Sequence, residues 1–335
     1  MMHRRENLGR TLIIANPRAH AGAADVVAAD LQRFLELHHQ DIVSFELVRT
    51  ERPGHAAELA CDAQGYDTVL ALGGDGVVHE IVNGLMKQPM HSRPNLGLVP
   101  VGSGNDYART LGMDPGASED FAKLFCCERV SMDVGRIRFW DDLSEQSGAS
   151  GGKGFSSEPH CEEFFVETFS VGLDAAIALG CAMLHERTGL KGHALYTVSG
   201  LDVFIRRYRR YPLSVSYDRE KPREISALML AVQIGPTYGS GYRVCPDADP
   251  ADGLFDICCA QGGIPRAQAI SLFLRSKNGR HIASKRIDLR RARRVELVLD
   301  SRDYPIQADG ERIVARHLIL ESLPHALRVL RPLRT

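Results

Sequence analysis

The sequence predicts an α/β domain with a parallel sheet and helices on both of its faces, followed by a β-rich, sandwich-like domain. Two observations lead to this expectation. The chain has 335 residues, which exceeds the usual size of a single domain. Strand-like and helix-like segments alternate as far as residue 131, and strand-like segments dominate after it. We therefore expect domains at 1–131 and 132–335, of which about 12 final residues could pack back on the first domain.

The first domain repeats a unit of strand, turn and helix. Apolar runs of strand length occur at 11–15, 41–48, 68–72 and 96–102. Apolar residues with helical spacing occur at 23–37, 55–63 and 77–86. Because this alternation is typical of parallel sheets, we expect ligands to bind at the carboxyl ends of the strands.

The second domain is predicted from a change in pattern after Ser131. Strand-like segments occur at 132–139, 164–171, 213–217, 226–235, 254–260 and 293–300. Helices are expected near 175–187 and 193–209. The polar segment 141–163 is rich in Gly and Ser and predicts a flexible surface loop.

The composition excludes several classes of protein. Lys and Arg number 41 and Asp and Glu 42, so no overall field attracts nucleic acid. The apolar runs are too short for a membrane-spanning helix or a signal peptide. The eight cysteines contain no C-x-x-C pair, which favours reduced thiols over disulfides. The chain is therefore expected to be soluble and cytoplasmic.

Two glycine turns carry the strongest chemical signal. GGDG (73–76) lies between a buried strand and a helix, and VGSGND (101–106) follows the next strand. Backbone N–H groups in such turns, together with a helix N-terminus, suit a phosphate. Asp75 and Asp106 would repel that phosphate unless they bind Mg²⁺, accept a proton or orient a hydroxyl group. The two turns are expected to converge on one cleft.

These turns belong to a longer series of motifs. LALGGDGVVHEIVNGL (70–85) and LGLVPVGSGNDYARTLG (96–112) stand between NPRAHAG (16–22) and the later PDADPADGLFDI (246–257) and ADGE (308–311). In this order they resemble the superfamily of diacylglycerol kinases and sphingosine kinases, from about residue 11 to 332. One departure is Val77, which stands where the family usually has a Thr that contacts phosphate.

The resemblance implies an enzyme that uses ATP and Mg²⁺. Its nucleotide site would comprise Asn16, Thr50, Gly73, Gly74, Asp75, Gly76, Glu80, Gly102, Ser103 and Asn105. Glu311 matches the proposed general base on the lipid hydroxyl, with Asp75 and Asp106 as catalytic acidic neighbours.

The resemblance also implies a structural magnesium site. The site would use the backbone carbonyls of Asp249 and Leu254 and the carboxylate of Asp252. The residues themselves leave a calcium-like or purely hydrogen-bonded turn open as the alternative.

The expected reaction is ATP-dependent phosphorylation of diacylglycerol to phosphatidic acid, a step of phospholipid biosynthesis. A kinase of sphingoid bases or ceramide, an NAD-kinase-like enzyme with a soluble substrate, and a non-catalytic lipid-binding regulator remain alternatives. A homodimer is left open, and nucleic acid is not expected as a partner.

Two basic clusters bear on membrane contact. The first contains Arg206, Arg207, Arg209 and Arg210 among aromatic residues, and the second spans 290–294 with Lys285 and Arg286. Such clusters can hold a protein against anionic headgroups, although charge runs are more often ordinary solvated faces. We expect a cytoplasmic protein that is transiently at the inner face of the membrane.

Overall fold

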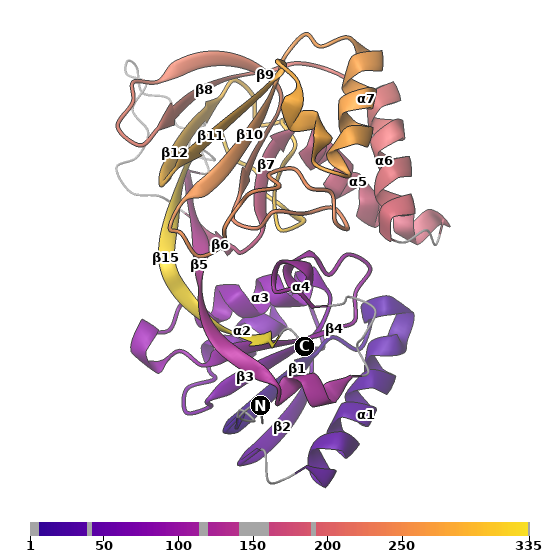
Figure 1. Ribbon diagram of the computed structural model, residues 1–335, viewed down its shortest axis with the longest axis vertical. Helices are drawn as coiled ribbons and strands as arrows, with labels where there is room; N and C mark the ends of the chain where they lie inside the picture. Colours follow the sequence, from indigo (N-terminus) through magenta and orange to yellow (C-terminus); the bar gives the residue numbers. More distant parts are fainter. Residues whose placement is uncertain (1–6, 39–41, 114–119, 141–160, 189–191, 334–335) are drawn as a thin grey trace, which may run out of the picture.

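The computed structural model describes residues 7–38, 42–113, 120–140, 161–188 and 192–333. The chain forms two halves, one above the other, which two long strands connect (Figure 1). Short 3₁₀ helices lie at Ala19–Gly22, Met90–Ser92, Phe121–Leu124 and Arg280–Ala283.

A four-stranded parallel sheet forms the first half. Its strands lie in the order β2 (Ser44–Arg49), β1 (Arg10–Ala15), β3 (Thr68–Gly73) and β4 (Asn95–Pro100). Helix α1 (Ala23–Leu37) packs on one face, and α2 (His55–Cys61) and α3 (Asp75–Leu85) pack on the other. The short helix α4 (Asp106–Thr110) follows β4. The expected α/β domain with helices on both faces is confirmed.

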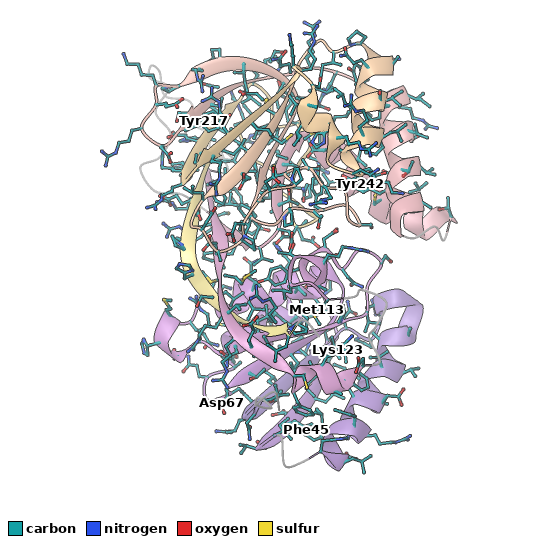
Figure 2. All side chains as sticks on the ribbon, in the orientation of Figure 1. Phe45, Asp67, Met113, Lys123, Tyr217 and Tyr242 are labelled. Atoms are coloured by element: carbon teal, nitrogen blue, oxygen red, sulfur yellow. The ribbon has the colours of Figure 1, made fainter. Side chains whose placement is uncertain are left out.

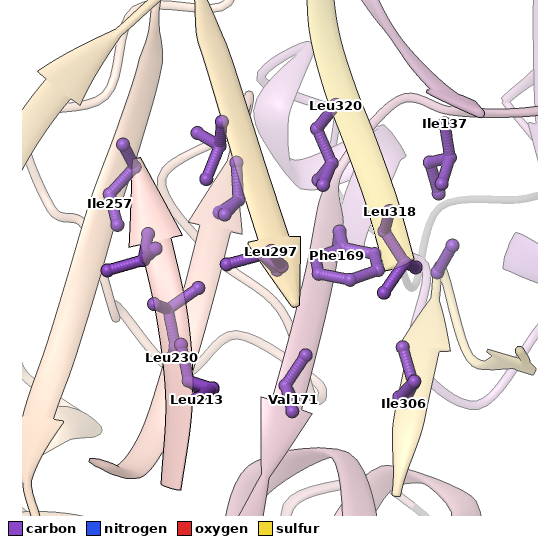
Figure 3. Close-up of a cluster of buried hydrophobic side chains, with 14 of the residues drawn as sticks. Ile137, Phe169, Val171, Leu213, Leu230, Ile257, Leu297, Ile306, Leu318 and Leu320 are labelled. Carbon is purple, nitrogen blue, oxygen red and sulfur yellow. The ribbon is translucent and has the colours of Figure 1, made fainter. Parts of the chain in front are cut away.

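The second half is mainly antiparallel. Its strands are β7 (Thr168–Gly172), β8 (Tyr211–Tyr217), β9 (Arg223–Gln233), β10 (Phe255–Gln261), β11 (Ile287–Ala292), β12 (Arg294–Leu299), β13 (Ile306–Ala308) and β14 (Glu311–Arg312). Figure 3 shows the apolar core between them, with Phe169, Leu230 and Leu297 fully buried. Helices α5 (Leu173–Thr188), α6 (Gly192–Arg206) and α7 (Arg266–Ser276) pack outside this core against β9 and β10.

Two strands run through both halves. β5 (Cys127–Trp140) pairs with β15 (His317–Pro332) along nearly its whole length, with an irregularity between Leu323 and Leu327. The end of β15 also pairs in parallel with β4, through Val329 and Leu96. At its other end β5 pairs with β6 (Cys161–Phe165), and β15 pairs with β12. The two sheets are therefore joined by a continuous ribbon (Figure 1).

The structure corrects several expected elements. The segment 164–171 is not one strand, because the backbone N–H groups of Val166, Glu167 and Thr168 turn to the Asp309 carboxylate at 2.8–3.0 Å. Helix α3 begins inside the predicted turn at Asp75. The elements α7, β11 and β15 were not predicted. Of the predicted loop 141–163, residues 161–163 begin β6 and 141–160 lie outside the described residues.

Candidate active site

The carboxyl ends of the four parallel strands bring four predicted nucleotide residues to one edge of the sheet. The N–H of Asn16 donates to the Leu72 carbonyl at 3.0 Å, and the N–H of Thr50 donates to the Ala15 carbonyl at 2.8 Å. Gly73 and Gly102 end or follow the neighbouring strands β3 and β4. Ligands of parallel sheets bind at this edge.

The two glycine turns touch each other through their backbones. A Cβ atom on Gly102 would lie 2.5 Å from the Cα of Gly74, and one on Gly73 would lie 2.6 Å from Val77 Cγ1. A side chain at Gly102 would therefore force the two turns apart, and one at Gly73 would displace Val77 at the start of α3. Helix α3 starts directly after Gly74, so its first N–H groups and its dipole face the same space.

Asp75 and Asp106 converge beside Gly104. A Cβ atom on Gly104 would lie 2.7 Å from Asp75 Oδ2 and 3.5 Å from Asp106 Oδ2. Burial and the neighbouring Asp106 charge raise the pKa of Asp75 to about 7, against the weaker opposing effect of the Tyr107 N–H. Burial also raises the pKa of Asp106, although backbone donors oppose it. The pair is thus poised to take up a proton or a cation near neutral pH.

Asp106 is held by hydrogen bonds from the second half of the molecule. Its carboxylate accepts hydrogen bonds from the N–H groups of Ser240 at 2.8 Å and Gly241 at 2.7 Å. Its nearest cation is Arg109, whose Nε lies 3.9 Å away. The acid of one half is therefore fixed by the backbone of the other.

Glu311 reaches the phosphate turn from the second half. It begins β14, after a two-residue turn in which Asp309 and Gly310 both have positive φ, 47° and 95°. A Cβ atom on Gly76 would lie 3.8 Å from Glu311 Oε1. The predicted base and the GGDG turn therefore face each other across the two halves.

His79 joins these parts, a role that was not predicted from the sequence. Its imidazole lies 3.0 Å from Glu163 and 3.5 Å from Asp309, and its side chain is only 7% exposed. Burial disfavours the charged ring, but the two carboxylates outweigh this effect and raise the pKa of His79 to about 10. His79 and Asp309 are 230 positions apart, so no local pattern could link them.

We expect the His79→Gln variant to unfold more easily by roughly 3 kcal/mol at pH 6.5, because the buried Asp309 carboxylate and the partly buried Glu163 carboxylate lose their cation. The folded-state pKa of His79 is raised, so its stabilisation is complete below the unfolded value of 6.5 and is lost as pH rises through about 10. Urea unfolding at pH 6.5 and at about pH 10 should show that the difference in free energy of unfolding between wild type and variant shrinks at the higher pH. His91→Gln, at an exposed histidine, is the matched control. A difference that does not change with pH would contradict an ionic role.

Of three other predicted nucleotide residues, one lines the pocket and two make hydrogen bonds within the first half. Glu80 accepts hydrogen bonds from Gly54 N–H at 2.9 Å and Ala56 N–H at 3.1 Å, so its carboxylate holds the start of α2. Ser103 is exposed and lines the pocket above the turns. Asn105 donates from Nδ2 to the Gly102 carbonyl at 3.0 Å and stabilises the second turn.

The predicted structural magnesium site forms a hydrogen-bonded turn. The Asp252 carboxylate contacts Arg291 and accepts the Leu254 N–H at 3.0 Å. Asp249 Oδ1 accepts the Ala251 N–H at 3.1 Å. In this structure the Asp252 carboxylate is paired with Arg291. Across the part of the chain that the structure describes, no group of three or more His, Cys, Asp or Glu side chains is placed to hold a metal ion. A metal at Asp249, Asp252 and Leu254 stays a prediction.

An acidic pocket and an apolar cavity lie next to each other. The acidic pocket is lined by Asp75, Asp106, Glu167 and Asp309, beneath α5 and α6. Tyr196 and Tyr238 line both this pocket and a cavity of apolar side chains enclosed by α5, α6, α7 and the sheet. Tyr242, labelled in Figure 2, also lines the cavity and stacks on Phe273 of α7.

Glu167 was not predicted from the sequence as a site residue, and Asp309 was considered only as part of the ADGE motif. Burial and the charges of Asp106 and Asp309 raise the pKa of Glu167 well above its usual value. The Thr110 hydroxyl is close enough to oppose this shift, yet it makes no hydrogen bond of standard geometry with the carboxylate. Glu167 therefore adds an acid to the back of the pocket.

None of the helices in the described residues is long and apolar enough to cross a bilayer.

Comparison with known proteins identifies two domain families along the chain. Residues 10–137 match the diacylglycerol kinase catalytic domain, and residues 167–331 match the YegS C-terminal NAD kinase beta sandwich-like domain. A diacylglycerol kinase of Mycobacterium tuberculosis is 28% identical over 337 residues, which cover 98% of this chain and 97% of the relative. Sphingosine kinase 1 of Rattus norvegicus is 36% identical over 135 residues, covering 36% of this chain and 35% of the relative.

The fold has a counterpart among solved structures. The crystal structure of a diacylglycerol kinase from Bacillus anthracis matches with a TM-score of 0.71 at 19% identity, and the match covers 96% of both chains. This likeness confirms the two-part architecture.

Proposed function

Because the chain belongs to the superfamily of diacylglycerol kinases and sphingosine kinases, we propose that this lipid kinase transfers the γ-phosphate of ATP to the free hydroxyl of diacylglycerol. The product would be phosphatidic acid. One observation carries the proposal: acids from both halves meet between two glycine turns and an apolar cavity. This arrangement suits a donor held by phosphates on one side and an acceptor held by acyl chains on the other.

Different residues of the chain would have different roles in phosphoryl transfer. The glycine turns and the first turn of α3 would hold the phosphates of ATP through backbone N–H groups. Glu311, close to Gly76, would accept the proton of the lipid hydroxyl as the phosphate bond forms. The turn before Glu311 is fixed because the Asp309 carboxylate accepts hydrogen bonds from three backbone N–H groups.

Mg²⁺ fits the acidic pair of Asp75 and Asp106. Burial raises the pKa of both carboxylates, and a divalent cation would relieve the cost of ionising them side by side. Mg²⁺ commonly takes one or two carboxylates together with substrate phosphates and water, so an all-protein cage is not required. When bound, it would neutralise charge on the phosphates of ATP.

The apolar cavity favours an acceptor with long hydrocarbon chains. Its lining is almost entirely apolar and includes Leu173, Ile177, Phe204 and Leu272. Tyr196 and Tyr238 pack edge to face between the acidic pocket and this cavity, with ring centres 6.1 Å apart, so an acyl chain that enters the cavity would displace them. Such an acceptor resides in a membrane, so we propose peripheral contact at its cytoplasmic face.

A labelled-ATP assay in mixed micelles tests this function. The panel contains diacylglycerol, monoacylglycerol, sphingosine, ceramide and NAD, each with and without Mg²⁺. Diacylglycerol should be phosphorylated at least about tenfold faster than the others, and only with Mg²⁺. A preference for sphingosine or ceramide would support the second candidate, and phosphorylation of NAD alone would overturn the lipid assignment. The absence of turnover with every acceptor would favour a non-catalytic lipid-binding protein.

A further inference from the structure

A basic pocket lies at the surface where α6 ends and α7 begins. Arg209 and Arg210 follow α6, and Arg266 is the first residue of α7. Tyr208 lies among them, and its hydroxyl donates to the Ile264 carbonyl, which fixes the ring in the wall of the pocket. The structure thus gathers arginines that the sequence separates by more than fifty positions.

Aromatic rings and backbone groups hold these arginines. The Arg266 guanidinium lies 5.5 Å from the centre of the Tyr208 ring, and that of Arg209 lies 5.1 Å from the centre of the Tyr211 ring. Arg209 also donates to the Asp303 carbonyl at 3.1 Å. Within the residues that the structure describes, none of Arg209, Arg210 and Arg266 forms an ion pair with a carboxylate. Their charge is available to an external anion.

Several other arginines of the predicted basic clusters are paired with carboxylates. Arg206 pairs with Asp202 at 2.8 Å, and Arg294 pairs with Glu296 at 2.8 Å. Arg290 pairs with Asp288 at 3.2 Å. The pocket therefore combines two arginines of the first predicted cluster that, among the described residues, lack a carboxylate partner with Arg266 from a separate segment.

Buried apolar residues line the wall of the pocket, and exposed apolar residues lie on the helix that precedes it. Leu228 and Ile264 line both the basic pocket and the apolar cavity. On α6, Val198, Leu201 and Ile205 are exposed at helical spacing, with Ile205 69% exposed. Positive charge beside exposed apolar side chains is the pattern of a surface that rests in the headgroup layer of an anionic bilayer.

We propose that Arg209, Arg210 and Arg266 bind the headgroup phosphate of an anionic phospholipid and so dock the protein on the bilayer. Guanidinium groups suit this ligand because their forked N–H donors match phosphate oxygens. The inference rests on the proposed function, since docking here sets the apolar cavity beside the membrane that holds the acceptor.

Sedimentation with lipid vesicles tests the site. The wild type should bind vesicles of phosphatidylcholine that contain phosphatidylglycerol, and bind those of phosphatidylcholine alone weakly. The R209Q/R210Q/R266Q variant should bind the anionic vesicles roughly 100-fold more weakly. Inorganic phosphate at the same charge concentration should not compete well, because the bilayer also takes up the apolar side chains of α6.

A matched variant removes the same charge elsewhere. R219Q/K221Q/R223Q changes the turn after β8 and the first residue of β9, roughly 20 Å away along β8, and should bind vesicles like the wild type. Equal binding by both triple variants, or loss of binding in both, overturns the site. If R209Q/R210Q/R266Q does not fold, Arg266→Gln alone should still weaken vesicle binding several-fold. Arginine-dependent binding to an RNA duplex instead of vesicles would also overturn it.

Turnover separates this inference from the proposed function. A short-chain diacylglycerol dissolved below its micellar concentration needs no docking, so wild type and R209Q/R210Q/R266Q should phosphorylate it at the same rate. The absence of that turnover in both proteins contradicts the proposed function. Normal turnover together with unchanged vesicle binding in the variant contradicts only the docking site.

Discussion

The Asp75→Asn variant is expected to lose at least about 100-fold in kcat while its melting temperature rises. Asparagine has nearly the same shape, but it cannot carry the negative charge that a cation between protein and ATP would require. The folded-state pKa of Asp75 is raised to about 7, so its ionisation destabilises the fold progressively as pH rises from its unfolded value of 3.8. The neutral amide removes that cost at pH 8.

The pH dependence gives a second measurement on the same residue. Because Asp75 must be ionised to act, wild-type kcat should fall as pH drops through about 7. Asp67→Asn, at an exposed aspartate below the sheet, removes the same charge without touching the pocket, and its kcat should be normal. Near-normal turnover of Asp75→Asn with micellar diacylglycerol would remove Asp75 from the catalytic group.

The Glu311→Gln variant is expected to lose at least about 100-fold in kcat with little change in the KM for ATP. Glutamine keeps the size of the side chain but cannot accept the proton of the lipid hydroxyl. Glu311 is exposed at the start of the short strand β14, so the melting temperature should stay within a degree or two of wild type.

The neighbouring residue provides the control for Glu311. Arg312 is exposed on the same short strand, and Arg312→Gln should have close to wild-type kcat. A parallel rise in the KM for ATP in Glu311→Gln, with kcat preserved, would assign Glu311 to nucleotide binding rather than proton transfer.

Much of the candidate site could be predicted from local patterns in the sequence. The glycine turns could be predicted because a strand, a glycine turn and a helix lie next to each other in the chain. The convergence of Asp75 and Asp106 followed because neighbouring parallel strands end at one edge of the sheet. Gly104, whose lack of a side chain leaves room for both carboxylates, belongs to the same motif.

Contacts between distant segments could not be predicted. The buried link from His79 to Asp309 depends on the packing of α3 against a turn 230 positions later. The break of segment 164–171 has the same origin, since its backbone turns toward Asp309 rather than continuing as a strand. Arg266 joins Arg209 and Arg210 only because α7, an element without a clear periodic signal, packs beside α6.

The ribbon of β5 and β15 has a consequence for the order in which the protein folds. Until β15 has been synthesised, the outer edge of β4 lacks the partner that Val329 supplies. The nascent α/β half therefore has an unpaired edge strand until β15 pairs with it. An unpaired edge favours slow folding and association with other chains. A fragment that ends at residue 137 keeps its glycine turns but lacks β15, and should aggregate rather than bind nucleotide as a separate unit.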